Sequence, residues 1–229
     1  MKKSEKMAVI YIVLVAAALV ASCVIYGKLT TFRYEKHLDD EVISVDGREI
    51  TLREFGVSIY DVESAIQQQA LAYDSENPGL WWNTHFSAGA DSAFMSDYAK
   101  EMAVNICICN EIYSKEAEKE GLSLSDEEKE QISEEADETY LKMSLAQRKA
   151  TGVSRDIVYE NRIKRAFAGK YAAFLAKNAD LSGYNEEPTK LLNWDGDYYK
   201  DVIYPEHDIK ENDKLLDNIT FGKITVNNE

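Results

Sequence analysis

The chain has 229 residues, and its 26 basic residues against 41 acidic ones give a formal net charge of −15. A surface with this charge repels nucleic acid and anionic lipid headgroups, so we expect no nucleic-acid partner. Glycine and proline are sparse, at 11 and 3 residues, which favours helices. The length suffices for one domain of ordinary size with an anchor and a tail.

Residues 1–28 predict a membrane anchor. Met7 to Tyr26 carries no charge and is long enough, as a helix, to cross the roughly 30 Å core of a bilayer. A short lysine-rich head precedes it, as in an export signal. Two versions are open: a retained transmembrane helix, or cleavage before Cys23 and lipidation of its thiol, since the VASC sequence ending there fits a bacterial lipobox. Both versions place the rest of the chain on the extracytoplasmic face of the cell membrane.

A polar spacer at 29–40 leads into a predicted β-hairpin. The run EVISVDGREIT at 41–51 has two β-rich arms joined by Asp46 and Gly47, a dipeptide that supplies the positive φ of a tight turn. Thr51 and Glu54 then stand three apart as a helix capping box.

Apolar residues recurring at intervals of three and four predict a mainly helical domain over 41–178. Ser125 and Glu128 form a second capping box, and Ser154 can begin the last helix. Asp91 is the expected cap of the longest helix. The expected helices cover 51–74, 91–120, 126–144 and 154–178.

Residues 179–229 form an acidic tail with few periodic apolar positions. Its strand-like run is Ile219 to Val226, with the sequence ITFGKITV. Because an isolated hairpin is only marginally stable in water, we expect this run to join the hairpin at 42–51 as a further strand.

The loop between the first two long helices carries the candidate binding residues. Trp81, Trp82 and Phe86 lie outside any helical stripe that would bury them, and Met95 and Tyr98 follow at the start of the next helix. Aromatic and methionine side chains offer apolar contact that tolerates many partner sequences. We therefore expect these five residues to border a binding cleft. The alternative is that both tryptophans belong to the core.

No pattern in the chain predicts catalysis, a cofactor or a metal ion. The three histidines stand apart from one another and from any metal-ligand spacing. Two of the cysteines, Cys107 and Cys109, read as small core residues. Asp195 and Asp197 hint at a calcium loop but lack the ligand spacing of an EF-hand.

The order of these features resembles a known family. It begins with the hairpin and its DG turn and continues with the helix start Ile50-Thr51-x-x-Glu54-Phe55. It continues with the boundary AEKEGLSLSDEE at 117–128 and with TGVS at 151–154. Residues 41–178 resemble the N-terminal chaperone domain of extracytoplasmic foldases of the SurA and PrsA type. Members often carry a parvulin prolyl-isomerase domain too, but the residues after Asn178 show no glycine-rich parvulin pattern.

The resemblance implies a fold that binds polypeptides, and not isomerase chemistry. The expected function is that of a membrane-tethered chaperone, which captures unfolded secreted polypeptides without catalysis. Two alternatives stay open: a prolyl isomerase with a degenerate or missing catalytic domain, and an adaptor that binds one dedicated partner. Binding of many unrelated clients would separate a chaperone from an adaptor.

Overall fold

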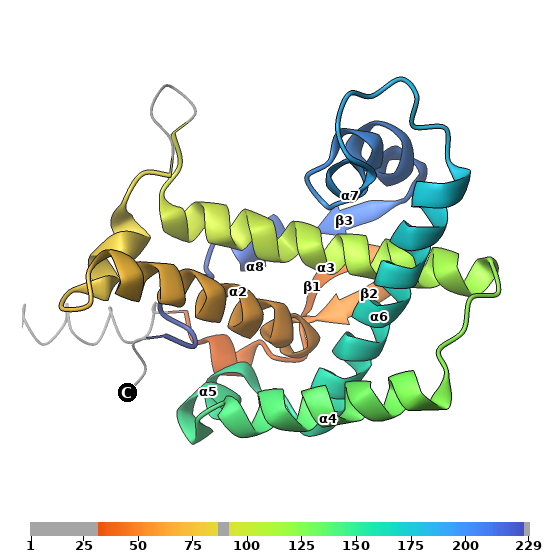
Figure 1. The fold of residues 1–229 in the computed structure, drawn as a ribbon. Coiled ribbons are helices and arrows are strands. Elements are labelled where there is room, and N and C mark those ends of the chain that lie inside the picture. Colours follow the sequence, from red (N-terminus) through yellow and green to blue (C-terminus); the bar gives the residue numbers. More distant parts are fainter. Residues whose placement is uncertain (1–31, 87–91, 227–229) are drawn as a thin grey trace, which may run out of the picture. The chain divides into compact units, whose positions relative to one another are not determined.

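The computed structural model describes residues 32–86 and 92–226, and the chain from Tyr34 onward forms one compact unit. The predicted anchor, with Cys23, lies outside the described residues. Across residues 32–86 and 92–226, no helix is both long enough and apolar enough to cross a bilayer. The mainly helical class with a small hairpin near its N-terminus is confirmed (Figure 1).

The elements follow one another in this order. Before the first long helix come η1 (Tyr34–Lys36), β1 (Glu41–Val45) and β2 (Arg48–Thr51). The helical part comprises α2 (Leu52–Tyr73), η2 (Pro78–Asn83), α3 (Met95–Lys119), α4 (Asp126–Lys142), α5 (Leu145–Thr151) and α6 (Arg155–Asn178). The last part holds α7 (Pro188–Leu191), η3 (Tyr199–Ile203), η4 (Tyr204–Glu206), β3 (Ile209–Glu211) and α8 (Asp213–Leu216).

The hairpin forms as predicted, with φ angles of +50° at Asp46 and +79° at Gly47 in its turn. A third strand does join it, but the prediction that Ile219–Val226 supplies this strand is wrong. β3 pairs antiparallel with β1, so the strand order is β2-β1-β3. The Asp46 carboxylate accepts hydrogen bonds from His207 Nδ1 and from the Asp208 N–H, and thereby guides the chain into β3.

The first long helix begins as the capping box predicts. In α2, the Glu54 N–H donates to Thr51 Oγ1 at 3.3 Å, and the Glu54 carboxylate accepts from the Thr51 N–H at 2.9 Å. The helix ends at Tyr73, one residue before the predicted stop. Its buried face includes Phe55 and Ile59, which have no solvent exposure.

The second long helix starts later than predicted. α3 begins at Met95 with Phe94 at its N-cap, and Asp91 lies outside the described residues. The helix runs to Lys119 and is followed by Gly121, whose φ of +71° fits the predicted stop.

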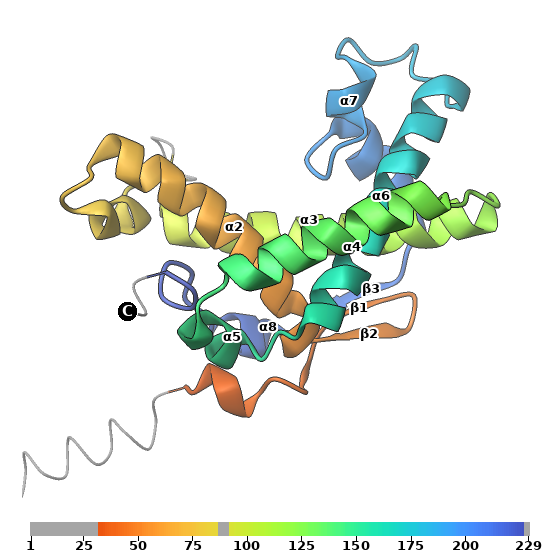
Figure 2. The same ribbon diagram turned by 60° about the horizontal axis from the view of Figure 1, so that its bottom comes forward.

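The capping box of Ser125 and Glu128 begins α4, and Ser154 caps α6, both as predicted. The short helix α5 between them was not expected. Its own capping box joins Ser144 and Gln147. Because α5 has only seven residues, its sequence shows little helical periodicity. α6 packs against both α3 and α4 (Figure 2).

The chain after Asn178 packs within the same compact unit. The Tyr113 hydroxyl on α3 donates a hydrogen bond to the Leu192 carbonyl at 2.8 Å. Tyr199 is buried edge-on against Tyr113, with ring centroids 5.7 Å apart. Tyr113 therefore holds residues 191–203 against the C-terminal half of α3, through its hydroxyl and through its contact with the Tyr199 ring.

Candidate functional site

The five residues predicted to border a cleft fall into two groups. Trp82 is 3% exposed and Met95 is 5% exposed, so both belong to the core. Trp82 Nε1 donates to Gln67 Oε1 at 3.0 Å, which satisfies its polar atom. Trp81 and Tyr98 are half-buried, and Phe86 is 52% exposed. Of the five, these last three are placed where a ligand could touch them.

Exposed apolar side chains gather where α2 ends and α3 begins. We call this set the apolar tip. Two of its rings lie on half-buried neighbours. Phe86 stacks on Tyr98, with ring centroids 3.9 Å apart and 7° between the ring planes, and the Tyr73 and Trp81 centroids are 4.9 Å apart. The tip consists of Leu71, Tyr73, Leu80, Phe86 and Phe94.

A groove of about 360 Å³ opens between α2, α3 and α6 and is bordered by the loop after α7. We call it the central groove. Its apolar lining is Val62, Ala65, Met102, Ile106, Cys109 and Trp194. Its polar lining is Ser58, Asp61, Asn110, Asn161, Arg165 and Asn193.

One face of α3 connects the apolar tip to the central groove. Tyr98, Met102 and Ile106 follow at intervals of four, and such residues lie above one another on one side of a helix. Phe86 extends this face through its stack on Tyr98. The arrangement offers an apolar strip long enough for several residues of an extended chain.

The edge of this strip is acidic. Burial raises the pKa of the Tyr98 hydroxyl, and the nearby charges of Asp195 and Glu101 raise it further. The Asp195 carboxylate also accepts a hydrogen bond from Asn193 on the groove lining. These two carboxylates place negative charge beside the Tyr98 end of the apolar strip.

An ion pair between a buried arginine and a partly exposed aspartate joins α6 to α2 beside the groove. Arg162 is 4% exposed, and its guanidinium donates to both oxygens of Asp61, at 2.6 and 2.8 Å. Its Nε lies 3.1 Å from Glu135, an ionic contact whose angle does not make a hydrogen bond. Burial would lower the pKa of Arg162, but Asp61 and Glu135 hold it above its usual value. The pair therefore sets the spacing of two groove walls.

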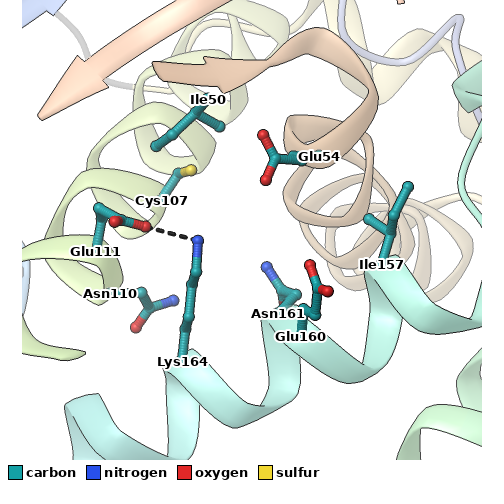
Figure 3. Close-up of a pocket in the computed structure, with 9 residues that line it drawn as sticks. All are labelled: Ile50, Glu54, Cys107, Asn110, Glu111, Ile157, Glu160, Asn161 and Lys164. Carbon is teal, nitrogen blue, oxygen red and sulfur yellow. Dashed lines mark hydrogen bonds and ion pairs between the residues drawn. The ribbon is translucent and has the colours of Figure 1, made fainter. Parts of the chain in front are cut away.

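A smaller pocket of about 30 Å³ lies next to β2, between α3 and α6 (Figure 3). Lys164 crosses it to reach the buried Glu111, with 2.7 Å between Nζ and Oε2. Cys107 also lines the pocket, and burial raises the pKa of its thiol to about 12. Such a thiol stays protonated at neutral pH, so it is a poor nucleophile. The space is large enough for about one water molecule.

Each histidine of the chain has a polar partner. His37 bonds Asp40, His85 bonds Ser92 and His207 bonds Asp46. Over residues 32–86 and 92–226, no group of three His, Cys, Asp or Glu side chains could hold a metal ion.

The residues proposed from the sequence lie at the tip end of the strip, and those of the central groove were not among them. Met102, Ile106 and Cys109 belong to the apolar stripes of the long helix, so their periodicity alone predicts core. Trp194 lies far along the chain in a segment without periodic apolar residues. Its proximity to α3 depends on the tertiary contacts of Tyr113 and Tyr199, for which the sequence carries no local signal.

Comparison with known proteins identifies the family of the chain. A sequence model described as the SurA-like N-terminal domain matches residues 1–153, about two-thirds of the chain. Comparisons with curated proteins and with solved structures give no match. The matched range contains the hairpin, α2, α3 and the two capping boxes on which the resemblance was based. The chain therefore belongs to the SurA-like N-terminal domain family, a family of chaperone type.

Proposed function

We propose that this protein is a membrane-tethered, extracytoplasmic chaperone that binds unfolded secreted polypeptides without catalysing a reaction on them. The observation that carries the proposal is the continuous apolar strip from Phe86 along α3 into the central groove. Membership of the SurA-like family supports the chaperone class.

The chemistry of the strip suits a client of variable sequence. Met102 is unbranched and adapts its shape, and the aromatic side chains supply large apolar contact areas. Asn110, Asn161 and Asn193 line the groove with amides that can both donate to and accept from a client backbone. The net charge of −15 helps to keep a complex with an aggregation-prone client in solution.

The groove can be tested with one added charge. Ala65 is exposed within the groove, and Ala65→Glu places a carboxylate there without removing any core contact. Gln131→Glu on the exposed side of α4 is the matched control, since it changes the net charge equally. The readout is suppression of aggregation of a chemically unfolded protein. We expect Ala65→Glu to require at least five times more chaperone for the same suppression, and Gln131→Glu to match the wild type.

Several unrelated unfolded proteins should be used in this assay. Suppression of all of them supports a chaperone, whereas binding to one partner alone would favour the adaptor alternative. Equal activity of Ala65→Glu and wild type would refute the groove as the client site.

The tether is a separate part of the proposal. It rests on the uncharged run Met7 to Tyr26 and on the lipobox-like sequence before Cys23. Full-length protein should stay with membranes through alkaline carbonate washing. Loss of lipid labelling in Cys23→Ala would favour the lipoprotein version, and unchanged size and membrane retention would favour the transmembrane helix. Release of the wild-type protein by carbonate would contradict both versions.

A further inference from the structure

The last described segment of the chain, Ile219–Val226, is apolar but is neither a helix nor a strand. We call it the tail segment. It runs alongside α2 near α5 and is drawn in dark blue in Figures 1 and 2. Ile219 and Phe221 are each 1% exposed, and Ile224 and Val226 are each 8% exposed. The tail segment therefore fills an apolar groove that would otherwise face water.

A buried carboxylate accepts hydrogen bonds from the backbone of the tail segment. Glu63, on α2, has no solvent exposure. One of its oxygens accepts from the Gly222 N–H at 2.5 Å, and the other accepts from the Thr225 N–H at 2.6 Å and from the Thr225 hydroxyl at 2.5 Å. Burial raises the pKa of Glu63, and these hydrogen bonds act against the rise. In this environment the tail replaces the water that the carboxylate would otherwise bind.

Two further side chains complete the walls. Gly222, at a φ of +85°, lies against the indole of Trp82, and a Cβ on it would come within 2.5 Å of Trp82 Cδ2. Gln147 on α5 donates from Nε2 to the Thr225 carbonyl at 2.7 Å. Glu63, Trp82 and Gln147 come from α2, η2 and α5, and we call the site they form the tail groove.

We propose that the tail segment is a displaceable occupant of a second peptide-binding groove, and that an extended segment of an unfolded polypeptide takes its place. This inference rests on the proposed function for the identity of the client. The site is distinct from the central groove, since the two share no lining residue.

The contacts of the tail groove suit exchange. Glu63 and Gln147 bind mainly backbone N–H and C=O groups, which every polypeptide has, so recognition tolerates different sequences. The tail segment lies after α8, so it can leave without breaking the pairing of β1 with β3. While bound, it acts as a tethered competitor at a high effective concentration.

Two full-chain variants weaken the tail without altering the groove. Gly222→Val clashes with Trp82 and is strained at positive φ. Thr225→Pro removes both hydrogen-bond donors that Thr225 offers to Glu63. The probe is a fluorescein-labelled synthetic peptide of residues 217–229, and its binding is measured by fluorescence anisotropy. Circular dichroism selects the variant that keeps the wild-type helix content.

We expect the peptide to bind the folded variant at least ten times more tightly than the wild type, and unlabelled apolar peptides to displace it. Adding Glu63→Ala to that variant should abolish binding. The same variant should suppress aggregation at a lower concentration than the wild type. Absence of peptide binding to a folded variant would overturn the inference. Peptide binding without a gain in suppression would also overturn it, since the groove would then accept the tail but no client.

The two proposals fail in distinguishable ways. If the wild type suppresses aggregation and the folded tail variants neither gain activity nor bind the peptide, the tail groove is refuted and the proposed function stands. If neither wild type nor variants suppress aggregation of any protein, the proposed function is refuted whatever the peptide does.

Discussion

Trp82 gives the sharpest stability prediction, because sequence alone allowed it to be either core or binding surface. Its indole is 3% exposed, donates to Gln67 at 3.0 Å and supports Gly222 of the tail segment. Trp82→Ala removes a large buried side chain and leaves a cavity, which costs about 3–5 kcal/mol in comparable cores. Loss of the tail contact adds to this cost.

The free energy of unfolding is measured by urea titration with far-UV circular dichroism. For a domain of this size, about 3–5 kcal/mol corresponds to a fall in melting temperature of roughly 6–20 °C. Trp82→Phe keeps most of the packing and loses the hydrogen bond to Gln67, so we expect a smaller loss of about 1–2 kcal/mol. Leu80→Ala is the control, since Leu80 lies on the same short helix but is 65% exposed, and its effect should stay within about 0.5 kcal/mol. If Trp82→Ala costs no more than Leu80→Ala, the placement of Trp82 in the core is wrong.

Three other predictions concern an ion pair beside the central groove, the pH dependence of stability and the absence of isomerase activity. Arg162→Met should cost about 1.5–3 kcal/mol, since it leaves Asp61 without its two charge-assisted hydrogen bonds; a urea midpoint equal to that of wild type would contradict this. Burial would raise the pKa of Glu54, but Arg48 and the helix cap hold it below the usual value, so its contribution is present above about pH 4.5 and is lost as the pH falls. Glu54→Gln should therefore lose less stability than wild type between about pH 6 and about pH 3, and parallel losses would count against the pairing. Purified residues 29–229 should leave the cis/trans rate of a prolyl test peptide at its uncatalysed value, and acceleration that grows with protein concentration would favour the isomerase alternative.

Local signals carried most of the fold. The DG turn and the capping boxes at Thr51 and Ser125 depend only on residues that are close in the sequence, so they can be predicted from it. Each is present in the structure. Helix α5 was missed because its capping box, at Ser144, stands at the end of a pattern already assigned to α4.

Contacts between segments that are remote in sequence could not be predicted from such local signals. Ile219–Val226 has high β-propensity, yet β3 forms at Ile209–Glu211, where Asp46 binds His207 and the Asp208 N–H beside the hairpin turn. The tail segment instead lies along α2, where the Glu63 carboxylate accepts hydrogen bonds from its backbone. A charged residue in an amphipathic helix gives no sign of burial in the sequence. Trp82 illustrates the same limit, because its environment includes the tail segment, which is remote in sequence.

Site-specific photocross-linking can show whether an unfolded client occupies the central groove. A photoreactive phenylalanine analogue at Ala65 lies in the groove, and the same residue at Gln131 lies on exposed α4. Each full-length variant is irradiated with a secreted protein in its unfolded and its folded form. We expect cross-links from position 65 to the unfolded form alone, with none above background from position 131. Equal labelling from both positions, or no labelling from position 65 in a folded variant, would contradict it.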